Sequence, residues 1–115
     1  MKYLFLLYAD ENGFPPQDSP EAQAIYAAYG AFFEEVSASG ALKAGDPVQA
    51  STTAKTVTLR DGQTSATDGP AAPGGEQVIG FYVLDVADEA EAVALAAKIP
   101  AAAHGRVEAR PILVM

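Results

Sequence analysis

The sequence predicts an α+β fold, a ferredoxin-like βαββαβ sandwich in which one face of an antiparallel sheet carries two helices. Two observations lead to this prediction. Apolar residues recur with helical spacing in residues 19–40 and 88–99. Runs rich in branched and aromatic residues indicate strands, at 2–8, 51–60, 63–67, 78–86 and 106–114. With 115 residues, no internal repeat and no long linker, the chain 1–115 is predicted to be a single domain.

The first part of the chain predicts a central strand and a long helix. Residues 2–8 are apolar on both faces, which is typical of a strand in the middle of a covered sheet. Ser19 is placed to cap a helix that has Pro20 at its first position. The apolar stripe of this helix comprises Ala22, Ile25, Tyr26, Tyr29, Phe32, Phe33 and Val36. Gly40 is expected to end the helix, and Gly45-Asp46-Pro47 to form the next turn.

The middle of the chain predicts a hairpin. Residues 51–60 are rich in Thr and branched side chains, which suit a half-exposed strand. Asp61-Gly62 is a two-residue hairpin signal that returns the chain through residues 63–67. A loop rich in Gly, Pro and small residues follows at 68–77.

A strand, a helix and a last strand complete the predicted fold. Residues 78–86 give the strongest strand signal in the chain. The helix at 88–99 begins with a capping-box pattern and stops before a proline. Residues 106–114 alternate, with Glu108 and Arg110 on one face and apolar side chains on the other.

The apolar pattern also predicts a partner. Two helices cover one face of the sheet only, whereas residues 2–8 and 81–84 are apolar on both faces. A second copy of the same sheet is the economical cover for the remaining face, so we expect an isologous homodimer that closes into an α+β barrel. Apolar area buried in this way contributes about 25 cal/mol per Å² before the cost of association.

Composition disfavours several classes of partner. The chain has 7 basic and 15 acidic residues, and its net charge of -8 opposes binding to nucleic acid or anionic membranes. The absence of cysteine excludes disulfides and thiolate catalysis. The apolar N-terminal run is too short for a signal peptide, and no stretch reaches the ~18–20 residues of a membrane helix. We therefore predict a cytoplasmic protein with no nucleic-acid or membrane partner.

Three titratable residues are candidate acid/base groups. Asp68 and Glu76 flank one loop, and two carboxylates in different environments can divide acid and base roles. His104 is the only histidine, the side chain that ordinarily titrates near neutrality. The structural alternatives are an Asx turn for Asp68, a solvated carboxylate for Glu76 and a helix-end position for His104.

Four further residues are candidates for ligand binding. Arg110 suits a bidentate clamp on a carboxylate, with pairing to Glu108 as the alternative. Tyr8 ends the first strand, where its hydroxyl reaches a cleft or its ring simply fills the core. Gly69 and Pro70 belong to the sharp loop that follows the hairpin. One histidine among scattered carboxylates predicts no metal site, and no glycine pattern cradles a phosphate, so no cofactor is expected.

Several motifs follow one another along the chain: Asp68-Gly69-Pro70, Glu76-Gln77, Gly80-Phe81, Ile99-Pro100 and Val107-Glu108-Ala109-Arg110-Pro111. With these motifs the chain resembles the YCII-related family, in particular its branch named for a DGPF motif, over essentially the whole sequence. The resemblance implies a bacterial, dimeric α+β barrel in which two ferredoxin-like subunits pack sheet to sheet beside a cleft. Relatives include isomerase-like and dehydrochlorinase-like enzymes, and DGPF-type proteins are linked to transcription through neighbouring sigma-factor genes.

The sequence departs from the family pattern at two places that matter for chemistry. Ala71 stands where the motif has Phe, and Pro73-Gly74-Gly75 replaces a polar stretch. The better-known YCII branch carries a His–Asp pair with its histidine on the first helix, where this chain offers Tyr26 and Tyr29. A His–Asp mechanism therefore cannot be carried over.

Two hypotheses for function remain. The favoured one is a dimeric module that binds a small ligand or a protein partner in or near the cleft between subunits. The alternative is an acid/base enzyme, isomerase- or lyase-like, acting on a small organic acid or lactone. In the alternative, Asp68 or Glu76 is the base, His104 the proton donor and Arg110 the anchor. Convergence of these four side chains around one cavity would favour the enzyme.

Overall fold

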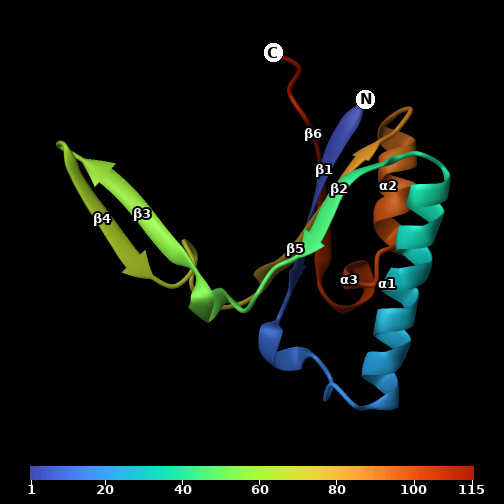
Figure 1. Ribbon diagram of the computed structural model, residues 1–115, viewed down its shortest axis with the longest axis horizontal. Helices are drawn as coiled ribbons and strands as arrows, with labels where there is room; N and C mark the ends of the chain where they lie inside the picture. The colour runs from blue at the N-terminus through green and yellow to red at the C-terminus, as the bar shows by residue number, and fades with distance from the viewer.

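The computed structural model describes residues 1–115 and contains a main sheet of four antiparallel strands in the order β2-β5-β1-β6. The strands are β1 (Lys2–Ala9), β2 (Leu42–Pro47), β5 (Gln77–Asp85) and β6 (Arg106–Pro111). The helices α1 (Pro20–Ala38), α2 (Glu89–Lys98) and α3 (Ala101–His104) lie on one side of this sheet (Figure 1). The predicted α+β fold, an antiparallel sheet with helices on one face in the ferredoxin-like order, is confirmed.

The helices begin and end where the sequence signals indicated. The Ser19 hydroxyl accepts a hydrogen bond from the backbone N–H of Ala22 at 3.2 Å, capping α1. Gly40 follows α1 with a positive φ of 80°, which glycine adopts without a steric penalty. The Asp88 carboxylate caps α2 by accepting from the N–H of Glu91 at 2.9 Å. No helix in the structure is both long and apolar enough to cross a membrane.

One strand of the main sheet, β2, was not predicted from the sequence. The predicted turn at Gly45-Asp46-Pro47 is the end of β2, an edge strand that pairs antiparallel with β5. An edge strand needs hydrogen bonds on one side only and therefore tolerates glycine and proline, which mimic a turn signal in the sequence. Two short turns of 3-10 helix also escaped the prediction, at Glu11–Gly13 and Ser51–Thr53.

The predicted hairpin forms but does not join the main sheet. Strands β3 (Lys55–Arg60) and β4 (Gln63–Asp68) pair only with each other, around a turn in which Asp61 and Gly62 both have positive φ. We call residues 55–68 the arm. The arm projects on the side of the main sheet that faces away from the helices (Figure 1).

The core lies between the helices and one face of the sheet. Alternate side chains of β1, namely Tyr3, Phe5 and Leu7, are buried there. They pack against side chains from α1, the end of β5, α2 and the segment that follows it, including Phe32, Val36, Leu84, Val86, Ala92, Ile99 and Ala101. This layer of side chains fixes the helices on the sheet.

The other face of the sheet carries half-buried apolar side chains that lie outside the core, and the helices lie on the opposite side (Figure 1). Leu4 pairs with Val83 and Leu6 with Phe81 across β1 and β5, out of phase with the buried residues. None of these four belongs to the core cluster or to the side chains packed against it. We call this surface, with Glu108 and Arg110 of β6 at its border, the open face.

Candidate ligand-binding cleft

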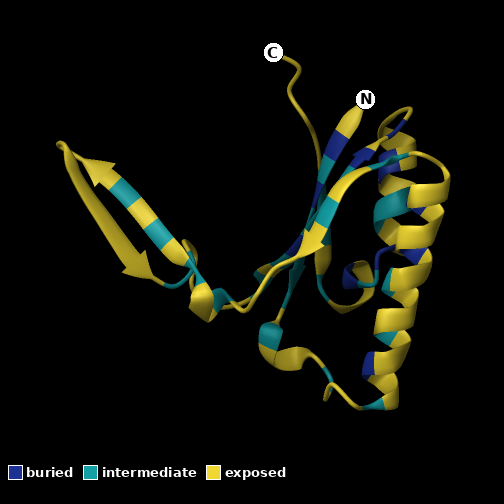
Figure 2. Cartoon of the chain, in the orientation of Figure 1, coloured by how far each residue is buried: buried dark blue, intermediate teal, exposed yellow.

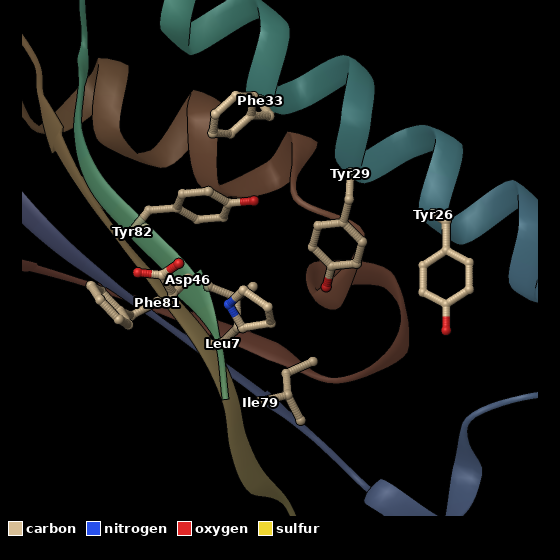
Figure 3. A pocket seen from close by; sticks show the side chains of 11 residues that line it. Leu7, Tyr26, Tyr29, Phe33, Asp46, Ile79, Phe81 and Tyr82 are labelled. Atoms are coloured by element: carbon tan, nitrogen blue, oxygen red, sulfur yellow. The ribbon is translucent and has the colours of Figure 1, made fainter. Parts of the chain in front are cut away.

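A cleft of about 450 Å³ opens between α1 and the β2–β5 side of the main sheet. Its walls come from elements far apart in the sequence: Tyr26, Tyr29 and Phe33 from α1, and Ile79 and Tyr82 from β5, which face one another across the opening (Figure 3). Leu7 of β1 also lines it. A concave, mainly apolar cavity of this size with a few polar groups is typical of a small-molecule site.

Small residues at the sheet edge leave room for the Tyr82 ring that forms one wall. A Cβ atom on Gly45 would lie 2.6 Å from Cδ1 of Tyr82, so only glycine fits beneath the ring. The Tyr82 ring in turn meets Phe32 edge to face, with ring centroids 5.2 Å apart. Tyr82 is therefore held between the core and β2.

The predicted apolar stripe of α1 is wider than the sheet can cover, and its outer residues form the other wall. Phe32 and Val36 are buried, whereas the Tyr26 and Phe33 side chains stay 47% and 49% exposed. Tyr26 also meets Phe14 of the preceding loop, with ring centroids 5.8 Å apart. The exposed aromatic residues of α1, Tyr26 and Phe33, therefore line the cleft.

The two phenols nearest the sheet are neutral hydrogen-bonding groups over the physiological pH range. Burial raises the pKa of Tyr82 above its ordinary value of 10.0. Burial also raises the pKa of Tyr29, repulsion from Tyr82 adds to the rise, and the backbone at Ala101 partly opposes it. Each hydroxyl can donate one hydrogen bond and accept others.

The residues predicted from the sequence lie elsewhere. Asp68, at the end of the arm, forms an exposed ion pair with Lys55. Glu76 accepts a hydrogen bond from Nε of Arg106 at 2.6 Å. Both carboxylates therefore already have cationic partners, and each partner lies on a different strand.

The other two polar candidates are also separate. His104 is exposed at the end of α3, near the loop that precedes α1. Arg110 forms an ion pair with Glu108 at the border of the open face. The structure of one chain thus does not gather Asp68, Glu76, His104 and Arg110 around a common cavity, and no group of three or more His, Cys, Asp or Glu side chains is arranged to hold a metal.

Three predicted residues do come together at the base of the arm. Tyr8, Pro70 and Glu76 line a shallow hollow of about 530 Å³. Gly69, beside it, has a structural role: its N–H donates to the carbonyl of Ala54 at 2.8 Å, and its φ of 107° suits glycine. This hydrogen bond fixes the place where the chain leaves the arm.

Sequence reasoning missed the aromatic cleft because it assigned the aromatic residues of α1 to the core. The available signal was the width of the stripe, since Tyr26 and Phe33, seven residues apart, lie together along one margin of it. Nothing in the sequence shows that Tyr82 leans over Gly45, because this contact joins strands whose pairing was not predicted.

The whole chain matches a known family of protein domains. The family model described as YCII-related domain matches residues 1–115. None of the curated proteins compared with the chain matches it.

Proposed function

We propose that this chain, which belongs to the YCII-related domain family, is a homodimeric module that binds a small neutral aromatic molecule. The observation that carries this proposal is the cleft between α1 and β5, with aromatic walls on both sides and two phenol hydroxyls. Flat ligands gain offset or edge-to-face contacts with such walls, in addition to the apolar area that they bury. Asp68-Gly69-Pro70 and Gly80-Phe81 support placing the chain in the DGPF branch of the family.

The lining of the cleft selects the class of ligand. It contains no Lys, Arg or His, and its one ionisable carboxylate belongs to Asp46. A carboxylate ligand would therefore lose water without gaining a cationic partner, at a cost of several kcal/mol. The net charge of -8 adds to the disadvantage. Neutral phenols, lactones and heteroaromatic amides suit the site better than organic acids.

The open face is the proposed dimer interface. Leu4, Leu6, Phe81 and Val83 form an apolar surface in the middle of the sheet, and the helices cover only the opposite face. Two such faces stacked about a two-fold axis would lie about 10 Å apart. This arrangement leaves the aromatic cleft, on the helix side of each sheet, accessible to ligand.

Ligand binding is tested by a thermal-shift screen of neutral aromatic fragments against matched aromatic carboxylates. A fragment at 100 times its Kd stabilises the folded state by about 2.7 kcal/mol. Tyr82→Leu removes an aromatic wall and should abolish the hits, while Tyr29→Phe removes one hydrogen bond and should weaken them roughly threefold to tenfold. Tyr8→Phe, in the hollow at the base of the arm, is the matched control. The proposal would be refuted if fragments bound Tyr82→Leu and Tyr29→Phe as tightly as wild type, or if the protein preferred aromatic carboxylates.

The dimer is tested by placing one charge on the open face. Leu6→Lys puts an ammonium group next to Glu108, its neighbour across β1 and β6, so in the single subunit the new charge shares this carboxylate with Arg110. In the dimer the same group is buried, and we expect a monomer at micromolar concentration in sedimentation experiments. Val93→Lys, on an exposed position of α2, introduces the same side chain and should leave the dimer intact. A wild-type monomer would overturn this part of the proposal.

A further inference from the structure

The arm stands apart from the body of the protein. The chain has a radius of gyration of 16.0 Å, whereas a compact chain of this length has about 13 Å. In Figure 2 the arm is almost entirely exposed, with β4 exposed over its whole length. A two-stranded hairpin is at best marginally stable in water, so an arm of this kind needs a surface to pack on.

One side of the arm carries its apolar residues, with the Lys55–Asp68 ion pair on the same side at the base. The cross-strand register pairs Val57 with Ala66 and Leu59 with Thr64, so that these residues share one side. Val57 and Leu59 are 62% and 63% exposed. The residues on the opposite side are polar: Thr56, Thr58, Arg60, Gln63, Ser65 and Thr67. The arm is thus amphipathic, and its apolar side has no partner within the chain.

Hydrogen bonds at its base fix the direction of the arm. The hydroxyl of Thr56 donates to the carbonyl of Gly69 at 2.8 Å. The N–H of Ser51, in the segment that leads into β3, donates to the carboxylate of Glu11 at 2.7 Å. The first bond joins the two ends of the arm at its base, and the second ties the segment before β3 to Glu11. Because the base is held in this way, less conformational freedom is lost when the arm packs on another molecule.

The position of the arm identifies its partner. The arm projects on the same side of the main sheet as the open face (Figure 1). Four strands about 4.8 Å apart and some six residues long cover roughly 400 Å², while a stable interface buries about 800 Å² per partner. Contact between two open faces therefore falls short, and the exposed Val57 and Leu59 of each arm offer further apolar surface on that side.

We propose that the arm is a clasp, which packs Val57, Leu59 and Ala66 against the body of a second copy of this chain seated on the open face. The inference rests on the proposed homodimer. Two-fold symmetry makes the contact reciprocal, since each subunit extends its arm over the other. The arm thereby gains the packing surface that a lone hairpin lacks, and the dimer gains area that the sheets do not supply.

The test compares dimer dissociation constants measured by sedimentation over a dilution series. Val57→Thr/Leu59→Thr keeps branched, strand-favouring side chains but removes the apolar side, and should raise the dimer Kd about tenfold or more. Thr58→Ser/Thr67→Ser, on the polar side of the same arm, is the matched control and should leave the Kd within about twofold. Unchanged unfolding of the body by denaturant would show that both variants fold.

The outcomes distinguish failure of the clasp from failure of the proposed dimer interface. If the apolar-side variant dimerises as tightly as wild type while Leu6→Lys is monomeric, the clasp is wrong and the dimer stands. If neither change affects association, both proposals fail. A control pair that weakens the dimer as much as the apolar-side pair also overturns the clasp. Hydrogen exchange is a second measurement: arm amides should slow as concentration rises through the Kd, and rates independent of concentration would contradict the inference.

Discussion

Substituting Gly45 by alanine tests how the wall of the cleft is built. The added Cβ would lie 2.6 Å from Cδ1 and 3.1 Å from Cε1 of Tyr82, whereas carbon atoms in contact are about 3.5–4.0 Å apart. The ring must therefore retreat by roughly 1 Å. Phe32 blocks movement toward the core, because the two rings already meet edge to face. The Tyr82 ring is thus expected to turn into the cleft.

The expected cost of Gly45→Ala is that of overpacking, about 1–3 kcal/mol of unfolding free energy, with loss of fragment binding. This cost is measured by denaturant unfolding of the four proteins of a double-mutant cycle: wild type, Gly45→Ala, Tyr82→Val and the double variant. Without the ring, alanine at position 45 should cost little, so the coupling free energy should be about 1–3 kcal/mol. An equal cost of Gly45→Ala in both backgrounds would refute the proposed contact.

Other predictions concern glycine and tyrosine residues. Gly105→Ala should destabilise by about 3 kcal/mol or more, because its Cβ would collide with the Tyr8 carbonyl oxygen and lie 2.9 Å from Cα of Ala9. Gly30→Ala, inside α1 with open space around it, should raise the free energy of unfolding by about 0.5–1 kcal/mol, measured by denaturant unfolding. Since burial raises the pKa of Tyr29 and Tyr82 in the folded state, the stability that they contribute is present below pH 10 and should fall as pH rises through the raised pKa values. Unfolding titrations between about pH 9 and 11 should show a smaller fall in Tyr82→Phe, and an identical fall would contradict the cause given for that shift.

The sequence predicts those parts of the fold that depend on local signals. The helix ends are marked by Ser19, Pro20, Gly40 and Asp88. Each of these residues either accepts a backbone hydrogen bond at its helix end or adopts the backbone angle required there. The apolar residues on both faces of β1 likewise predict a strand in the middle of the sheet, with an apolar surface opposite the core.

What the sequence does not predict depends on contacts between distant segments. Strand β2 contains Gly45 and Pro47, which suit a turn equally well, and only its pairing with β5 shows that it is a strand. The cleft arises because rings of α1 and Tyr82 of β5 face one another beside the edge strand β2. Of the residues selected for chemistry, Tyr8, Pro70 and Glu76 share a hollow, while Asp68 and Arg110 pair with local charges. Residue type alone does not show which charges already have partners.

The most direct test of the account is a chemical-shift map of the dimer with the tightest neutral aromatic fragment. We predict the largest changes for the side-chain signals of Tyr29, Phe33, Ile79 and Tyr82, and none for Tyr8. Changes centred on Tyr8, Pro70 and Glu76, at the base of the arm, would contradict the assignment of the aromatic cleft as the binding site.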